Sequence, residues 1–446
     1  MNTIRRRCAH LLGALIVPLS MVLLSGVAIA QTAEGLEVDV EQGGLVLFQL
    51  AVPDAISLNG KSDTQGITEA VTGTIVRDLK ISGFFNLLDK QAFLVDPTAE
   101  GMTPKYRDWF NIGTQGLVKV GYTLSDGKVL LDMRLYSVDT SQRVELKAPY
   151  DGPVELPVDP RRLRSHAHGF VNEIIRHYTR QPGFFNSQIV VVKRVKSGKE
   201  LYMVSADGMD ETRLTKTGGI NMLPSIGSGR IYFTSFRNGG AHLFSLSGGK
   251  ARSFAAYKGL NTGGVLSPDG QYVAATLSKD GNPELYLLHP DTGKVIKRLT
   301  NSWGIDTSPA WSPDGKRIAF VSNRHGSPQI WVMNADGTEP KRLTFQGDYN
   351  QTPDWNPRGN LIAFTARDER AVFDIFTVDV NDGKITRLTQ NQGNNEEPSW
   401  SPDGRFLAFT STRTGRAKLY IMNDNGRYQT QISTGKGTYL TPCWSR

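Results

Sequence analysis

Two histidines, His166 and His168, are the residues whose type could serve metal binding or proton transfer. They stand two positions apart in a segment of helical periodicity, where such neighbours point in different directions. No other cysteine or histidine lies at the spacing of a zinc site. We therefore expect a solvated basic helix here. The segment 423–426, Asn-Asp-Asn-Gly, begins like a calcium loop but lacks the later ligands and the closing glutamate, so it predicts a turn.

The short motifs of common enzyme chemistry are missing from the sequence. It contains no Gly-x-Ser-x-Gly turn, no glycine-rich phosphate loop and no His-Glu-x-x-His pair. Two acidic residues, Asp354 and Glu397, lie near the repeated tryptophan segments. They could be the catalytic groups of a hydrolase or lyase that works in a central channel. That interpretation and a carbohydrate-binding one stay open beside a non-enzymatic protein. We expect no cofactor and no metal.

A repeated segment supplies the framework that must position any such residues. Pro-Ala-Trp-Ser-Pro-Asp-Gly at 309–315 returns in related form at 353–359, 398–404 and 442–445, in steps of 44, 45 and 44 residues. A second motif, an apolar strand followed by a turn and Arg-Leu-Thr or a relative, gives a count of six units. Four strand-length segments per unit predict a six-bladed β-propeller over residues 187–446. Ser-Pro-Asp-Gly has turn chemistry, and the preceding tryptophan is expected to pack between blades.

The repeats also predict how the propeller closes. The first unit begins at Ile189 without a Trp-Ser strand, whereas the Trp-Ser strand at 439–445 has no unit of its own. We expect this C-terminal strand to become the innermost strand of the first blade. That arrangement leaves no open sheet edge.

Residues 45–182 show strands alternating with helices, which predicts a compact α/β domain. Ser-Asp-Gly-Lys at 125–128 is a hairpin turn between two of the strands. The expected strands are 45–52, 84–89, 117–124 and 129–138, and the expected helices are 64–81, 106–110 and 161–180.

The first 30 residues have the pattern of a secretory signal. Three arginines at 5–7 precede an apolar run at 11–24 and Ala-Ile-Ala at 28–30. Cleavage would lower the net charge from +8 to about +5, which is weak evidence for nucleic-acid binding. It would also remove Cys8 and leave Cys443 alone, so no intramolecular disulfide is expected. We expect an exported, soluble protein without membrane insertion.

The segment 31–44, here called the tail, alternates apolar and acidic residues. Leu36, Val38 and Val40 point one way, and the acidic residues between them point the other. Such a segment can form an ordinary edge strand or can add to the sheet edge of a partner.

One rim of the propeller, here called the mouth, is the candidate recognition surface. It comprises the connections from each outermost strand to the next innermost strand, at 258–264, 301–308, 345–352 and 390–397, and the second-to-third strand turns. Polar residues with aromatic interruptions suit protein recognition, although plain solvated loops stay open. The candidate contact residues are Asn261, Thr262, Trp303, Asp306, Tyr349, Asn350, Gln351, Asn395 and Glu396.

The chain resembles the TolB family, the periplasmic propeller proteins of the Tol–Pal envelope system. The propeller motif is shared with other propellers, but the segment 66–89, which ends in Ile-Ser-Gly-Phe-Phe-Asn-Leu-Leu-Asp, resembles the family's first helix and the turn and strand that follow. The resemblance covers nearly the whole length after the signal. The chain departs from the family pattern near 260–262, where a histidine is expected, and its tail is more acidic.

The resemblance implies a non-enzymatic periplasmic adaptor, expected as a monomer without nucleic acid. Its mouth would bind Pal, the peptidoglycan-associated lipoprotein, and its tail would bind the C-terminal domain of TolA through Leu36, Val38 and Val40. The implied role is support of outer-membrane integrity and of envelope constriction during cell division.

Overall fold

The computed structural model describes residues 47–367 and 370–445, all within one compact unit, residues 37–446. The predicted signal at 1–30 and the tail residues Leu36, Val38 and Val40 lie outside the described residues. None of the helices in the described ranges combines the length and the apolar character needed to cross a membrane.

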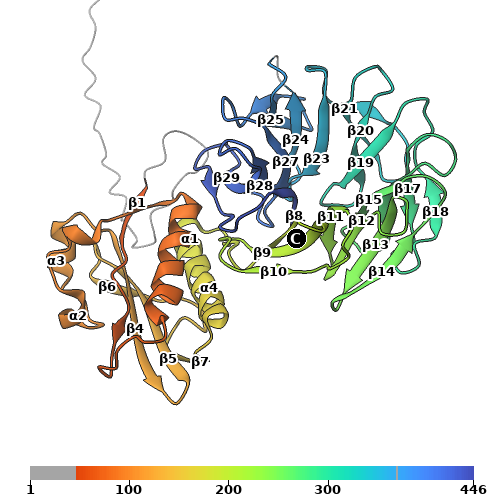
Figure 1. The fold of residues 1–446 in the computed structure, drawn as a ribbon. Coiled ribbons are helices and arrows are strands. Elements are labelled where there is room, and N and C mark those ends of the chain that lie inside the picture. The colour runs from red at the N-terminus through yellow and green to blue at the C-terminus, as the bar shows by residue number, and fades with distance from the viewer. Residues whose placement is uncertain (1–46, 368–369, 446) are drawn as a thin grey trace, which may run out of the picture. The chain divides into compact units, whose positions relative to one another are not determined.

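The N-terminal part is a seven-stranded sheet with helices packed on it (Figure 1). The main strand order is β3-β1-β4-β5-β6, while β2 pairs with β4 and β7 with β5. Its strands are β1 (Phe48–Ala51), β2 (Ile56–Ser57), β3 (Phe85–Leu87), β4 (Gly116–Ser125), β5 (Lys128–Ser137), β6 (Gln142–Val144) and β7 (Val154–Pro157). Strand β1 pairs in parallel with β3 and β4, and β4 pairs antiparallel with β5.

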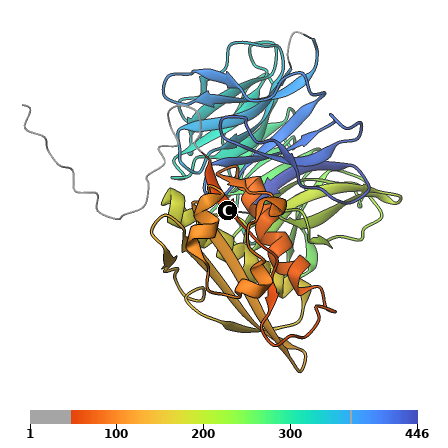
Figure 2. The same cartoon turned by 90° about the vertical axis from the view of Figure 1, so that its left-hand side faces the viewer.

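Helices α1 (Thr74–Ser82) and α4 (Pro160–Thr179) run side by side next to this sheet (Figures 1 and 2). A π-helical turn, η1 (Glu69–Gly73), precedes α1, and Gly83 ends α1 with φ +68° in the left-handed region that glycine tolerates. The shorter helices are η2 (Lys90–Ala92), α2 (Pro97–Glu100) and α3 (Tyr106–Asn111). The α/β prediction is confirmed.

Six four-stranded sheets form the propeller, so the predicted six blades are confirmed. Blade 1 holds, from the inside outward, β31 (Tyr439–Trp444), β8 (Gln188–Val195), β9 (Gly198–Ser205) and β10 (Glu211–Arg213). The C-terminal strand therefore closes the ring as expected. Blades 2 and 3 hold β11 (Asn221–Gly227), β12 (Arg230–Ser235), β13 (His242–Ser247) and β14 (Lys250–Ala255), then β15 (Asn261–Leu266), β16 (Val273–Leu277), β17 (Glu284–Leu288) and β18 (Val295–Arg298).

Blades 4 to 6 repeat the same antiparallel order. Blade 4 holds β19 (Asp306–Trp311), β20 (Arg317–Ser322), β21 (Gln329–Asn334) and β22 (Lys341–Arg342). Blade 5 holds β23 (Asn350–Trp355), β24 (Leu361–Arg367), β25 (Phe373–Asp379) and β26 (Ile385–Arg387). Blade 6 holds β27 (Asn395–Trp400), β28 (Phe406–Ser411), β29 (Lys418–Asn423) and β30 (Thr430–Gln431).

The repeated tryptophans are scaffold, as predicted from their spacing. Trp311 is buried among residues of blade 3, and its indole N–H donates to the Val265 carbonyl at 3.1 Å. Trp400 likewise donates to the Asp354 carbonyl in blade 5 at 3.1 Å. These bonds tie blade 4 to blade 3 and blade 6 to blade 5.

The α/β part contacts the propeller at the rim opposite the mouth. Arg405, in the turn between the first two strands of blade 6, donates to the Pro182 carbonyl at 2.5 Å. Phe84 and Phe184 pack on Phe406, with ring centroids 6.1 and 4.4 Å away. Since an antiparallel blade places these turns at the end away from its second-to-third turn, the contacts leave the mouth uncovered by this part of the chain.

Candidate functional site

The mouth exposes a set of large apolar side chains. Trp303 is 77% exposed and Phe345 is 71% exposed, which is unusual for such side chains. Both lie on connections between blades. Seven members of the set lie on these connections, on a second-to-third strand turn or at the start of an inner strand: Ile220, Leu223, Phe236, Trp303, Ile305, Phe345 and Tyr349. Exposed apolar side chains among polar loops are a composition found in protein-recognition surfaces.

The connection that carries Trp303 is held from beneath. The buried Glu284 carboxylate accepts hydrogen bonds from the Thr300 hydroxyl at 2.5 Å and the Ser302 N–H at 2.8 Å. Asn282 donates to the carbonyls of Ser302 and Gly304 at 2.8 and 2.5 Å. These bonds fix the backbone on both sides of Trp303. Binding of a partner would therefore cost little conformational entropy in this loop.

The same support recurs beneath other mouth loops and explains the Arg-Leu-Thr motif. In blade 4, the Gln329 side-chain oxygen accepts from the Thr344 hydroxyl and from Asn350 Nδ2, both at 2.8 Å. In blade 5, Asp374 accepts from Thr389 at 2.6 Å and from Asn395 Nδ2 at 2.8 Å. The threonine of the motif and the first residue of the next blade thus donate to the same side chain on the third strand.

The predicted contact residues differ in their exposure, and these hydrogen bonds account for the buried ones. Trp303 and Tyr349 are exposed, and Thr262, Gln351 and Glu396 are partly buried. The buried members are Asn261, Asp306, Asn350 and Asn395. Their side chains are hydrogen-bonded or ion-paired within the chain, and Asp306, for example, pairs with Arg324 at 2.7 Å. They shape the mouth, whereas the apolar set makes up much of its exposed surface.

A channel runs inside the innermost strands, with a cavity of about 480 Å³. Each innermost strand has a shift in register and a residue with positive φ, a β-bulge that turns its backbone toward the channel. The six bulge residues are Leu223, Gly263, Ser308, Thr352, Glu397 and Thr441. Sequence reasoning missed this ring, although a proline follows five of its six members.

The channel carboxylates bind backbone groups. Asp354 accepts from the Trp400 N–H at 2.7 Å, and Glu397 accepts from the Thr441 N–H at 2.5 Å. Desolvation raises the pKa of Glu397 to about 7, against the opposing effects of the Thr441 bond and Lys199. Both acids therefore have a structural task between neighbouring blades.

We expect Glu397→Gln to stabilise the protein at pH 8. Because the pKa is raised in the folded state, folded protein binds more protons than unfolded protein between about pH 4.5 and 7, and stability falls as pH rises through that window. Glutamine keeps an acceptor for Thr441 and has no charge. Urea unfolding at pH 5 and pH 8 should show a gain of about 1 kcal/mol at pH 8 only, after discounting for channel solvent. Glu339→Gln, at an exposed turn, is the control and should show no such difference.

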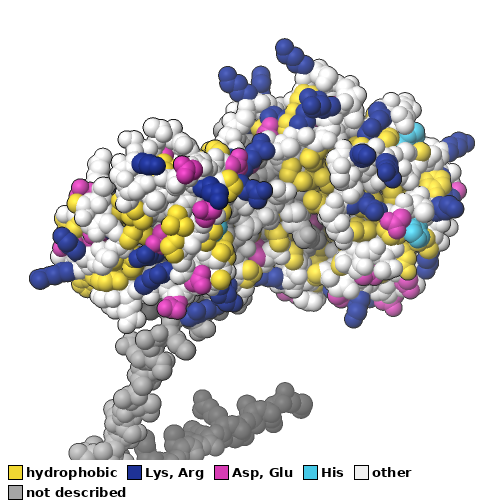
Figure 3. Space-filling view, turned by 90° about the horizontal axis from the view of Figure 1, so that it is seen from below, with side chains coloured by type: hydrophobic (Ala, Val, Ile, Leu, Met, Phe, Trp, Pro, Cys, Tyr) yellow, Lys and Arg dark blue, Asp and Glu magenta, His cyan; other side chains and the backbone are white. Residues whose placement is uncertain are grey.

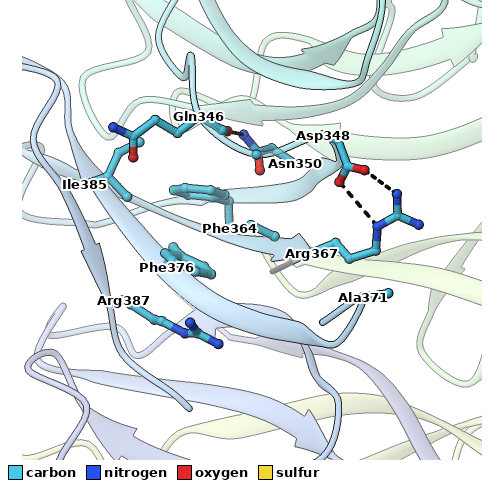
Figure 4. Close-up of a pocket in the computed structure, with 11 residues that line it drawn as sticks. Gln346, Asp348, Asn350, Phe364, Arg367, Ala371, Phe376, Ile385 and Arg387 are labelled. Carbon is cyan, nitrogen blue, oxygen red and sulfur yellow. Dashed lines mark hydrogen bonds and ion pairs between the residues drawn. The ribbon is translucent and has the colours of Figure 1, made fainter. Parts of the chain in front are cut away.

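A second cavity, of about 670 Å³, lies on blade 5 beside the mouth (Figure 4). Phe364, Phe376 and Ile385 form its apolar wall. Its charged groups are engaged within the protein, since Arg367 pairs with Asp348 at 2.5 Å. The ion pair links the mouth loop at 345–350 to β24. It also occupies charged groups that a small ligand would otherwise bind.

The expectation for His168 was wrong. Its side chain is buried, and its Nδ1 lies 2.6 Å from Asp78 Oδ2 on α1. On the other side of the ring, Nε2 faces Asp207 of blade 1 at 3.9 Å. A signal was present: His168, Val171 and Ile175 recur at positions i, i+3 and i+7 on the apolar face of α4.

Basic side chains are spread over both parts of the chain on the face seen in Figure 3 rather than gathered in one patch. The fold defines a class of protein: a closed six-bladed propeller, preceded by an α/β part, with exposed apolar side chains on one rim.

Comparison with known proteins gives the family. Residues 175–446 match the family described as the TolB beta propeller domain, and residues 36–144 match the TolB amino-terminal domain. The chain belongs to the TolB family. A "Tol-Pal system protein TolB" of Myxococcus xanthus is 41% identical over 431 residues, covering 95% of this chain and 97% of the relative. Another so named, of Anaeromyxobacter dehalogenans, is 41% identical over 406 residues, covering 88% and 90%.

A solved structure agrees with this assignment. The crystal structure of TolB from Acinetobacter baumannii superposes with a TM-score of 0.76 at 26% identity, covering 90% of this chain and 96% of that one. The match therefore includes both the α/β part and the propeller.

Proposed function

We propose that this chain is a non-enzymatic periplasmic adaptor of the Tol–Pal system. Its mouth binds a Pal-like peptidoglycan-associated lipoprotein, and its tail binds the C-terminal domain of a TolA-like protein through Leu36, Val38 and Val40. In this role it supports outer-membrane integrity and envelope constriction during division. The observation that carries the proposal is the apolar set at the mouth, held on fixed loops and left open by the α/β part.

The composition of the mouth favours a folded protein partner. Large aromatic side chains at the centre of an interface contribute most of its binding energy, and a polar rim around them excludes water. Trp303 and Phe345 supply such anchors. Arg324 and Arg367, ion-paired with Asp306 and Asp348, add charged groups to the same rim. The relatives are named as Tol-Pal system proteins, which supports a partner from that system.

Trp303→Ala is expected to weaken binding of the soluble domain of Pal by about 2 kcal/mol, roughly 30-fold, because it removes a preorganised anchor. Phe345→Ala should act in the same direction. Isothermal titration calorimetry with the exported chain gives the two dissociation constants. Tyr272→Ala is a matched control, since Tyr272 is exposed at a turn on the opposite rim.

Equal affinities for wild type, Trp303→Ala and Phe345→Ala would reject the mouth as the Pal site. A chain that lacks residues 31–42 separates the two partner sites. It should lose binding to the C-terminal domain of TolA and keep binding to Pal. Retained TolA binding would reject the tail assignment and leave the mouth assignment standing.

A further inference from the structure

Three ionisable residues meet where the α/β part contacts blade 1. Asp78 comes from α1, His168 from α4, and Asp207 from the turn between β9 and β10. Asp78 and Asp207 have no exposed surface, and His168 is 5% exposed. Each offers one ligand atom, and these atoms all lie within 4.8 Å of one another. Two acids and an imidazole are thus enclosed in one small space.

Each of the three side chains retains an unused atom. Among the described residues, Asp78 Oδ1, His168 Nε2 and Asp207 Oδ2 have no hydrogen-bond partner, although all three are buried. Native proteins rarely leave such atoms unpaired, because a buried polar atom without a partner lowers stability. Their position together indicates that something absent from the polypeptide completes them.

The occupied atoms fix the orientation of the open ones. Asp78 Oδ2 lies 2.6 Å from His168 Nδ1, so the neutral imidazole has its proton on Nδ1 and its lone pair on Nε2. Asp207 Oδ1 accepts from the Ser205 hydroxyl at 2.5 Å and the Met209 N–H at 3.1 Å. A carboxylate that holds the far nitrogen of a histidine is the usual outer support of a metal-bound imidazole.

The nearest arginines do not occupy this space. Arg77 donates its Nε–H to the backbone carbonyl of Asp207 at 2.7 Å, not to either open carboxylate oxygen. Arg164 donates Nε–H to Asp210 Oδ2 at 3.0 Å. Neither arginine therefore satisfies the open oxygens of Asp78 and Asp207, which leaves those oxygens available to a small cation.

We propose that Asp78, His168 and Asp207 form a binding site for a divalent transition-metal ion of the zinc class, which ties the α/β part to blade 1. His168 Nε2 and Asp207 Oδ2 are the direct ligands, and Asp78 is a positioning residue that holds the imidazole and adds negative charge. Imidazole and carboxylate together suit Zn²⁺ better than Ca²⁺ or Mg²⁺.

The ligand atoms lie farther apart than in an occupied site. His168 Nε2 is 3.9 Å from Asp207 Oδ1, and one ligand atom from each of the three residues lies within 4.8 Å of the others. Two ligand atoms of a tetrahedral zinc ion lie about 3.4 Å apart, so binding requires the ligand atoms to approach by about 0.5 to 1.4 Å. Water would complete the coordination.

The test is zinc titration of the exported chain, purified without a histidine tag and stripped with a chelator. We expect one Zn²⁺ per chain with a dissociation constant below about 10 μM, and a melting temperature that rises with zinc. Co²⁺ should bind in its place and give the visible absorption of a site with a nitrogen ligand. Excess Ca²⁺ should not displace it.

Matched variants locate the ion. His168→Gln and Asp207→Asn should weaken zinc binding at least 30-fold, and Asp78→Asn should weaken it at least 10-fold. His166→Gln removes a histidine from the same helix outside the cluster and should bind as wild type does. Wild-type protein that binds no zinc overturns the proposal, whether or not any variant folds. Equal zinc binding by wild type and Asp207→Asn overturns it as well.

Discussion

Deleting residues 439–446 is expected to abolish the cooperative unfolding of the propeller. Strand β31 pairs with β8 from Tyr439 opposite Lys193 to Trp444 opposite Ile189, so its loss opens the ring at blade 1. Trp444 is buried, its ring packs on Phe184 with centroids 5.3 Å apart, and its indole N–H donates to the Ser187 hydroxyl at 2.7 Å. Removing one buried tryptophan alone costs about 3–5 kcal/mol. That is a large share of the stability of an ordinary domain.

The backbone contacts add to this effect. The Trp444 N–H donates to Ser399 at 3.0 Å and the Thr441 N–H to Glu397 at 2.5 Å, so β31 also joins blade 6 to blade 1. Without it, β8 is an unpaired edge beside apolar residues. Differential scanning calorimetry of the truncated chain should show a melting temperature lower by more than 10 °C, or no transition. Trp444→Phe keeps the strand and an aromatic ring, so its melting temperature should lie between those of the wild-type and truncated chains. An unchanged melting temperature after truncation would contradict ring closure as a source of stability.

Counting was enough to predict the blades. The repeat is recognisable because its residues interact within their own turn, as in Ser312, whose hydroxyl bonds Asp314 at 2.6 Å. Such short-range interactions require the same residue types in every blade and so produce a recurring motif. The Trp-Ser strand at the end of the chain, which has no unit of its own, implied how the ring closes. The helix around 161–180 was likewise visible from its apolar spacing, and it is found at Pro160–Thr179.

The mouth was harder, because its polar residues depend on partners far along the chain. Asn350 and Asn395 stand in loops and have the composition of a surface. Each is bonded to a residue 21 positions earlier, Gln329 or Asp374, at the start of the preceding blade's third strand. Nothing local marks such a pair. Trp303 and Tyr349, in contrast, were detectable because they interrupt mostly polar connections between blades.

The cluster at His168 shows the same limit between the two parts of the chain. Asp78 is 90 positions from His168, and the residue that faces it across the interface belongs to a blade. Desolvation raises the pKa of Asp78 to about 7, which reflects how completely the interface excludes water. Periodicity places His168 on the apolar face of its helix, but only the fold shows which groups it meets.

A buried ion pair in the α/β part should be the most sensitive single position there. Lys119 and Glu100 form this pair, with side chains 0% and 2% exposed, in the middle of β4 and at the end of α2. Lys119 also donates to the Gly101 carbonyl at 2.5 Å, and Glu100 accepts from the Trp109 indole at 3.1 Å. Desolvation lowers the pKa of Lys119, and Glu100 opposes that shift. The pair fastens α2 and α3 to the sheet.

We therefore expect Lys119→Met to destabilise the α/β part by about 3–5 kcal/mol, because it leaves the Glu100 carboxylate buried without its cation. The double variant Lys119→Met with Glu100→Gln should recover part of that loss, since the uncompensated charge is gone. Lys128→Met is the matched control: its pair with Glu155 is 61% and 60% exposed, and its removal should cost about 0–1 kcal/mol. Urea unfolding followed by tryptophan fluorescence measures all three. Equal unfolding midpoints for Lys119→Met and Lys128→Met would show that water reaches the Glu100 site and would remove the basis of the prediction.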